Sequence, residues 1–164
     1  MNLEIIHSIF NEIATKHKAI KTFYTGLASE FNPDFDLEYP ALLVDPVSVT
    51  KSMREGFFQN NWNIVMEVIN DLPEDRSQEN INKVLDSTQK IVDQVLSRLM
   101  TQYNDKSLTF NNQESRLDFV IQDNFSALPL IDDTESNHTG WQVTFTITEQ
   151  VRYSTCCNDD VYDA

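Results

Sequence analysis

The sequence predicts an α+β fold in which a mostly antiparallel sheet carries an N-terminal helix and one long central helix packed on it. Two segments alternate apolar and polar residues over many positions, as antiparallel strands with one buried face do. Two other segments repeat apolar residues every three or four positions, as helices with one buried face do. The order helix, strands, helix, strands, without a glycine-rich turn between strand and helix, favours α+β over a doubly wound fold.

The N-terminal third is expected to form a helix, a short strand and a loop. Apolar residues at Leu3, Ile6, Phe10 and Ile13 predict a helix over residues 2–16. The segment "IKTFYTGL" is rich in β-branched and aromatic residues, which predicts a short strand over residues 19–25. The stretch "EFNPDFDLEYP" that follows has two prolines and several acids and is typical of a loop.

Two strands are expected in the middle of the chain. "YPALLVDPVSVTK" is apolar and β-prone, but prolines remove ladder donors, so this strand should lie at an edge or break at Pro46. "FFQNNWNIVMEVIN" alternates strongly. Its even side is apolar, with Phe58, Trp62, Ile64, Met66 and Val68, and its odd side is polar, with Gln59, Asn61, Asn63 and Glu67.

A long helix is predicted from Ser77, a plausible N-cap residue, to about Thr101. Its apolar stripe consists of Ile81, Val84, Leu85, Thr88, Ile91, Val92, Val95, Leu96 and Leu99. Its polar face consists of Asp86, Gln89, Lys90, Asp93, Gln94 and Ser97. At ~1.5 Å per residue this helix is about 36 Å long, enough to cross a small domain and to be the core helix.

The C-terminal third is expected to end in a long strand. A short strand is predicted at Leu108 to Phe110, and "LDFVIQDNFSALPLIDD" alternates weakly. "GWQVTFTITEQVRY", residues 140–153, alternates almost without a break. Its apolar side has Trp141, Val143, Phe145, Ile147, Val151 and Tyr153, and its polar side has Gln142, Thr144, Thr146, Thr148, Gln150 and Arg152.

The length of this last strand carries a further expectation. Fourteen extended residues reach about 48 Å, whereas a compact domain of this chain length is about 40 Å across. The strand should therefore bend or project beyond its own sheet. A projecting strand with an open edge is an aggregation hazard unless another chain pairs with it, which favours an assembling subunit. Packing of Trp141 in the core predicts a loss of about 3–5 kcal/mol on its replacement by alanine.

Length, composition and charge limit the classes of function. The 164 residues are expected to form one domain over residues 1–154, followed by an acidic C-terminal tail over residues 155–164. No apolar run approaches a membrane span, and the N-terminus lacks the features of a signal peptide, so a cytosolic protein without membrane partners is expected. A net charge of −14 would repel nucleic-acid phosphates, so no specific nucleic-acid binding is expected.

The sequence offers few residues with an evident chemical role. Neither phosphate-binding glycine pattern occurs, and His7, His17 and His138 lie in three separate segments. The adjacent Cys156 and Cys157 are expected to be free thiols. The remaining candidate is the acidic turn with Asp132, Asp133 and Glu135, whose carboxylates suit a hard cation but lack the spacing of an EF-hand. We therefore assign no catalytic, cofactor-binding or metal-binding residue, and we expect no cofactor and no enzymatic activity.

The order of these features resembles that of the small neck and tail-completion proteins of tailed bacteriophages. The resemblance covers roughly residues 1–157 and is sharpest at Tyr39-Pro40, at the helix "SQENINKVLDSTQKIVDQVLSRL" and at Gly140-Trp141. The proteins concerned are tail terminators or head–tail connector rings, particularly those of phages that infect Bacteroidetes. This chain departs from them by the insertion "EFNPDFDLE" and by the acidic tail after Cys157.

The resemblance implies a structural virion subunit without catalytic residues or cofactors. Such a subunit forms a closed ring, six- or twelve-fold, and contacts neighbouring portal, connector or tail proteins. It is located in the neck or tail of the virion, and in the host cytoplasm before assembly. DNA slides through the lumen, where acidic walls repel the phosphates. Ring closure needs a head-to-tail interface, for which a projecting strand or the loop over residues 30–38 are the candidates.

Two other classes of function remain open at this point. One is a soluble cytosolic binding or adaptor module without catalytic activity, which would be a stable monomer with an exposed groove. The other is a carboxylate- or cation-dependent enzyme that uses the acidic cluster at residues 132–135.

Overall fold

The computed structural model describes residues 3–28, 37–54, 57–108, 119–131 and 138–152, and of Val47, Arg54, Val151 and Arg152 only the backbone. Within these residues the chain forms two helices and six strands. Their order is α1 (Leu3–Lys16), β1 (Thr22–Thr25), β2 (Ala41–Arg54), β3 (Phe57–Asp71), α2 (Gln78–Asn104), β4 (Phe119–Ile121), β5 (Ser126–Leu130) and β6 (His138–Arg152). The fold is α+β, as predicted.

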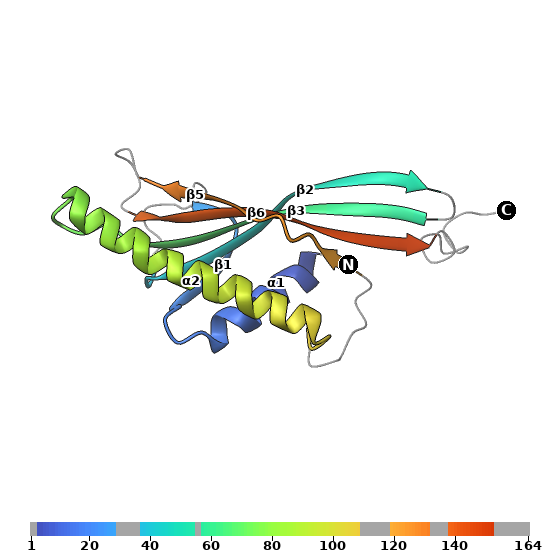
Figure 1. The fold of residues 1–164 in the computed structure, drawn as a ribbon, viewed down its shortest axis with the longest axis horizontal. Coiled ribbons are helices and arrows are strands. Elements are labelled where there is room, and N and C mark those ends of the chain that lie inside the picture. The colour runs from blue at the N-terminus through green and yellow to red at the C-terminus, as the bar shows by residue number, and fades with distance from the viewer. Residues whose placement is uncertain (1–2, 29–36, 55–56, 109–118, 132–137, 153–164) are drawn as a thin grey trace.

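The strands form one mixed, mostly antiparallel sheet in the order β1-β2-β3-β6-β4, with β5 also paired to β6. β1 runs parallel to β2, and the other pairs are antiparallel. Both helices lie on the same face of this sheet (Figure 1). This is the arrangement that the amphipathic patterns of the two helices require, because each has one apolar stripe to bury.

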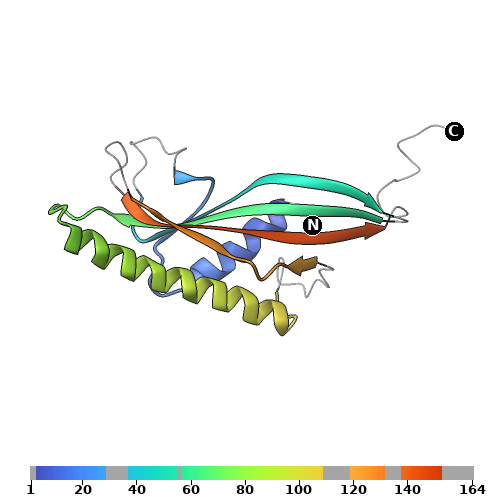
Figure 2. The ribbon, with the colours of Figure 1, turned by 45° about the horizontal axis from the view of Figure 1, so that its top comes forward.

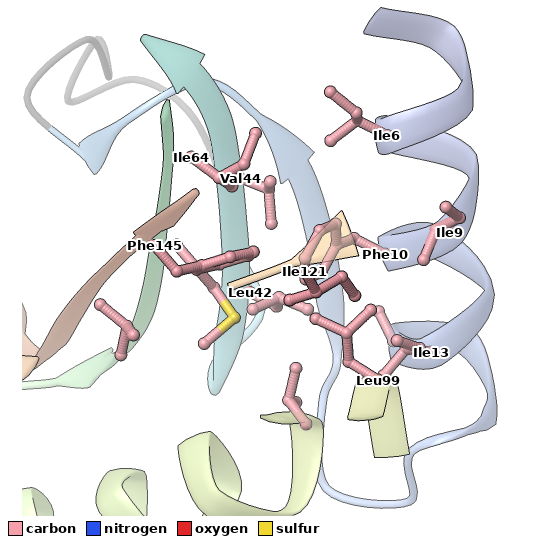
Figure 3. Packing of buried hydrophobic residues seen from close by; sticks show 14 of the residues in the cluster. Ile6, Ile9, Phe10, Ile13, Leu42, Val44, Ile64, Leu99, Ile121 and Phe145 are labelled. Carbon is pink, nitrogen blue, oxygen red and sulfur yellow. The ribbon is translucent and has the colours of Figure 1, made fainter. Parts of the chain in front are cut away.

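The main core lies between the helices and the sheet. Ile6, Phe10 and Ile13 of α1 are buried there, and α2 contributes Ile91, Val92, Val95 and Leu99. Figure 3 shows this packing, with Phe10 near Leu42, Ile121 and Phe145. The rings of Phe10 and Phe145 lie 6.1 Å apart, centroid to centroid. The predicted stripe of α2 is thus confirmed as its buried face, and all six predicted polar-face residues are exposed.

The opposite face of the sheet holds a second, smaller cluster that the alternation of β3 did not predict. On the even side of β3, Ile64, Met66 and Val68 are fully buried, as expected. On the odd side, Ile69 packs with Ala28, Ala41 and Leu43. Glu67, which the alternation places on the polar side of β3, is buried on this face, with only 4% exposed.

Strand β2 neither breaks at Pro46 nor lies wholly at an edge. Its first part, Ala41–Val44, has β1 on one side and β3 on the other. The pairing register with β3 shifts between Pro46 and Ser48, which is a β-bulge, and the strand then continues to Arg54. Beyond Val44 no described strand pairs with the other side of β2, so the expectation of an edge holds only for this second part.

Strand β6 is as long as predicted, but it does not project alone. It pairs with β3 along its whole length, from His138 to Arg152. On its other side it pairs with β5 at residues 140–144 and with β4 at residues 147–149. The expected single projecting strand with an open edge is therefore wrong for β6. The part of β6 that extends beyond the helices is paired with β3, which is in turn paired with β2.

Some of the remaining predicted elements lie within the described residues, and others lie outside them. α1 matches the prediction, β1 begins three residues later than expected, at Thr22, and α2 ends three residues later than expected, at Asn104. The weakly alternating segment forms β4 and β5. Leu108 is not in a strand, and residues 109 and 110 lie outside the described ranges. The acidic tail over residues 155–164 also lies outside the described ranges.

Candidate functional site

The most prominent feature of the molecule is an arm of three strands. We define the arm as residues 48–54 of β2, 57–63 of β3 and 146–152 of β6, which pair with each other without a break. Figures 1 and 2 show these strands continuing beyond both helices to one end of the molecule. The arm arises because β3 and β6 are each 15 residues long, whereas the helices cover only part of that length.

One face of the arm is polar and uncharged over six of its residues that lie in adjacent rows. Ser48, Asn63 and Thr146 form one row across the three strands, and Thr50, Asn61 and Thr148 form another. Their side chains bond to each other. Asn63 Nδ2 donates to Ser48 Oγ at 2.9 Å, and Thr146 Oγ1 donates to Asn63 Oδ1 at 3.2 Å.

The second row continues this network. Thr148 Oγ1 donates to Asn61 Oδ1 at 2.9 Å and accepts a hydrogen bond from Gln122 Nε2 at 3.2 Å. Gln59 Nε2 donates to the same Asn61 oxygen at 3.1 Å. Apart from the Gln59–Asn61 bond, which lies within β3, these hydrogen bonds join neighbouring segments and add to the backbone pairing that holds the arm as a preformed sheet. They also show that Thr146 and Thr148, on the polar side of β6, bond within the chain.

The other face of the arm continues the core face beyond the helices. Val49, Trp62 and Ile147 lie in one row there, at the margin of the core. The Nε1 atom of Trp62 is buried and has no hydrogen-bond partner in the described structure. Farther out, Met53 is 69% exposed, and at the tip Phe57 is 38% exposed on the polar face. The two exposed apolar side chains thus lie on opposite faces of the arm, close to its tip.

The charge of the arm differs from that of the whole chain. The arm segments contain the bases Lys51, Arg54 and Arg152 and the single acid Glu149, a balance of +2 in a chain of net charge −14. Glu149 accepts a hydrogen bond from Asn60 Nδ2 at 3.3 Å. Other acidic proteins would therefore meet less repulsion at the arm than elsewhere on this chain.

The titratable groups do not gather into a reactive centre in the described residues. No three His, Cys, Asp or Glu side chains come together there in a way that would hold a metal ion. Burial lowers the pKa of His7 on α1, and the carboxylate of Asp45 opposes this by raising it less. Burial also raises the pKa of Tyr39, with a smaller contribution from Asp71.

The three histidines lie apart, as the sequence predicts. His7 is in α1, and His17 follows α1, with its Nε2 2.9 Å from Gln94 Oε1 of α2. His138 begins β6. The candidate cation ligands Asp132, Asp133 and Glu135 lie outside the described residues, as do Cys156 and Cys157.

The one buried carboxylate among the described residues, that of Glu67, is hydrogen-bonded to two neighbouring segments of the chain. Glu67 Oε2 accepts the backbone N–H of Ala28 at 2.8 Å, and Oε1 accepts Gln142 Nε2 at 2.8 Å. Each carboxylate oxygen thus bonds to a different neighbouring segment, one to the residues after β1 and one to β6. Glu67 ties the end of the β1 connection to β3 and β6.

A shallow groove lies between α2 and the start of β2. Its volume is about 520 Å³, and it is lined by Ala19, Pro40, Asn70, Lys83, Asp86, Ser87, Lys90 and Ile91. Lys83 is engaged with Glu79 at 2.8 Å on its own helix. The groove is open to solvent and mixed in charge.

Comparisons with known proteins identify no relative. The chain matches no family model, and a search of curated proteins finds no match. Within the described residues, neither helix combines the length and the apolar character that crossing a membrane requires.

Sequence reasoning missed the arm as a unit, although a signal for it was present. Two strongly alternating segments of nearly equal length, residues 57–71 and 138–152, exceed what the helices can cover. Their pairing over the full length would have predicted a shared projection rather than a single projecting strand.

Proposed function

We propose that this protein is a structural subunit that assembles with copies of itself into a ring at the head–tail junction of a tailed bacteriophage. The observation that carries the proposal is the three-stranded arm. It extends past the core, it is preformed by its own hydrogen bonds, and it ends in the exposed Met53 and Phe57. Such a surface serves contact between proteins rather than catalysis.

The charge distribution supports this proposal. Subunits with a net charge of −14 repel each other and repel DNA, so a ring of them needs a contact surface that is not acidic. The arm has this property. The remaining acidic surface suits a lumen through which DNA passes without being held.

The test is assembly with purified portal and tail components of the phage that encodes the protein. We expect light scattering and electron microscopy to show rings that contain this chain, six- or twelve-fold, seated between portal and tail. Met53→Asp should reduce incorporation, because it places a charge on the exposed apolar part of the arm. Ser97→Asp, on the exposed face of α2, is the matched control and should assemble normally. A chain that joins neither component contradicts the proposal.

The groove beside α2 favours a second candidate function, a binding or adaptor module. Its mixture of Pro40, Ile91, Asn70 and two lysines suits a short polar or acidic segment of another protein. A pull-down from infected cells distinguishes the two candidates. Recovery of host proteins that is lost in a Lys90→Glu variant supports the adaptor, whereas recovery of portal or tail proteins supports the virion subunit.

A further inference from the structure

The groove beside α2 and the C-terminal end of β6 lie at opposite ends of the longest strand pair. Asn70 lines the groove and pairs with Thr139 near the start of β6. Arg152 ends β6 and pairs with Phe57 at the tip of the arm. Figure 1 shows the first half of α2 and the tip of the arm at opposite ends of the molecule. The chain therefore continues beyond Arg152 from a point far from its own groove.

The groove carries more basic than acidic side chains, although the whole chain has a net charge of −14. Its charged lining residues are Lys83, Asp86 and Lys90, and all three are exposed. Lys21, which is also exposed, adjoins the groove, because its backbone N–H donates to the carbonyl oxygen of Pro40 at 2.9 Å. Charge complementarity favours an occupant with several acids and no base.

The chain itself contains such a segment after β6. Residues 153–164, which lie outside the described ranges, include three aspartates and no base. Asp160 and Asp163 are about 10 Å apart in an extended chain. Lys83 and Lys90 are about 10 Å apart along α2 and lie on one side of it, because seven residues are nearly two turns. The spacing of the two acids thus matches that of the two lysines.

The groove of the same molecule is out of reach of these acids. From Thr139 to Arg152, β6 covers about 44 Å at ~3.4 Å per residue. Asp160 follows Arg152 by eight residues, which extend over about 27 Å at most. The acids can therefore meet this groove only on another copy of the chain.

We propose that residues 153–164 of one copy bind in the α2 groove of the next copy, with Asp160 and Asp163 at Lys83 and Lys90. The inference rests on the proposed function, since it names the contact between successive copies in the ring. The contact joins two different surfaces, so it is head-to-tail, as a closed ring of identical subunits requires. The arm brings the acidic segment to the neighbouring copy.

The test measures binding of a fluorescent peptide of residues 153–164 to the full-length protein, under reducing conditions because the peptide contains two cysteines. We expect saturable binding by fluorescence anisotropy, and at least tenfold weaker binding to Lys90→Glu. Lys90 is exposed, so this variant should fold as the wild type does, which circular dichroism checks. Lys106→Glu, exposed and outside the groove lining, is the matched control and should bind as the wild type does.

A charge exchange tests which groups meet. A peptide with Asp160→Lys and Asp163→Lys should bind the wild type poorly and the double variant Lys83→Glu/Lys90→Glu at least tenfold better. A double variant that gains no affinity for this peptide overturns the inference, because the acids would then not face these lysines.

Three further outcomes also overturn the inference. They are the lack of saturable binding to the wild type at millimolar peptide, equal binding to Lys90→Glu, and equal binding of a scrambled peptide of the same composition. In the last case the groove would accept any acidic segment. Rings that form with portal and tail components while the peptide does not bind contradict this inference alone. Peptide binding without such rings contradicts the proposed function alone.

Discussion

At the scale of single residues, Gly140 shows how closely β3 and β6 approach each other. A Cβ atom at this position would overlap the carbonyl oxygen of Val68 and would lie 2.9 Å from Ile69 Cα. The obstructing atoms are backbone, so no side chain can move aside. Glycine is therefore required here by packing between strands.

Gly140→Ala should destabilise the protein by about 1–3 kcal/mol, because the two strands must separate to admit the methyl group. Denaturant unfolding followed by circular dichroism measures this. Ser97→Ala on the exposed face of α2 should change the free energy of unfolding by less than about 0.5 kcal/mol. Equal stability of Gly140→Ala and the wild type would show that the strands are farther apart than described.

His7 connects the pH of the solution to stability. Its pKa is lowered in the folded state, chiefly by burial, and its Nε2 has no hydrogen-bond partner in the described structure. Between the lowered pKa and the ordinary value of about 6.5, the unfolded chain binds more protons than the folded one. The contribution of His7 is therefore fully present above pH 6.5 and is lost as the pH falls through the folded-state pKa.

We expect His7→Gln to flatten this part of the pH dependence, because glutamine does not titrate. Urea unfolding at a series of pH values between 4 and 7.5 gives the slope for both proteins. Titration of the His7 ring protons by NMR gives the folded-state pKa directly. A midpoint at or above 6.5 would contradict the described burial.

At the scale of elements, Trp141 joins α2 to the sheet. Its ring packs at the margin of the main core, and its Nε1 donates to the carbonyl oxygen of Leu85 at 2.9 Å. The residue is half-buried rather than fully buried. The loss predicted for Trp141→Ala, about 3–5 kcal/mol, should thus fall toward the lower end of that range.

Trp141→Phe separates the two contributions of the indole. It keeps most of the apolar contact but removes the hydrogen bond, so a loss of about 0.5–1.5 kcal/mol is expected. Thermal unfolding measures both variants against the wild type. If Trp141→Phe were as destabilising as Trp141→Ala, the hydrogen bond to Leu85 rather than packing would account for the effect.

Glu67 determines how the connection after β1 is attached to the sheet. Glu67→Gln replaces one acceptor by an N–H group that faces either the N–H of Ala28 or the amide of Gln142. We expect a loss of about 0.5–1.5 kcal/mol, because hydrogen bonds to a charged acceptor become bonds to a neutral amide, while the amide of Gln142 can turn to accept from the new N–H group. Chemical denaturation checks this value. Glu79→Gln on the exposed start of α2 is the control and should have little effect.

The elements with a strong period could be predicted from the sequence, and the contacts between elements could not. The stripe of α2 and the alternation of β6 specify which side chains face the core, because both periods arise from local geometry. The burial of Glu67 depends on Ala28, a residue 39 positions away whose position no local pattern encodes. The sequence predicted a break at Pro46 or an edge position for its strand, but not a bulge. Proline removes a hydrogen-bond donor without specifying the register in which the strand continues.

At the scale of the whole molecule, the arm and the core should differ in local stability. The core part of the sheet is covered by helices, whereas the arm is held by its own pairs and by β4 at residues 147–149, and the outer side of its β2 segment has no partner strand among the described residues. Amides of β2 from Ser48 to Arg54 should exchange faster with deuterium than those of β3 from Ile64 to Ile69. Mass spectrometry of peptides from both segments measures this. Equal protection of both segments would contradict an open edge.

The candidate function was less accessible from the sequence than the fold. The length of β6 indicated an extended feature, but β4 and β5 pair with most of its outer side, whereas residues 48–54 of β2 have no described partner strand on theirs. Those two short strands have weak periods, so their positions in the sheet depend on long-range pairing. The proposed role thus rests on the arm as the three strands form it together.

The bulge in β2 lies where the arm leaves the core. Pro46 and Ser48 pair with the consecutive residues Ile64 and Asn63, so Val47 is one residue more than the ladder needs. A bulge bends its strand and increases the local twist. We therefore expect deletion of Val47 to remove the bulge and to change the direction in which the arm leaves the core.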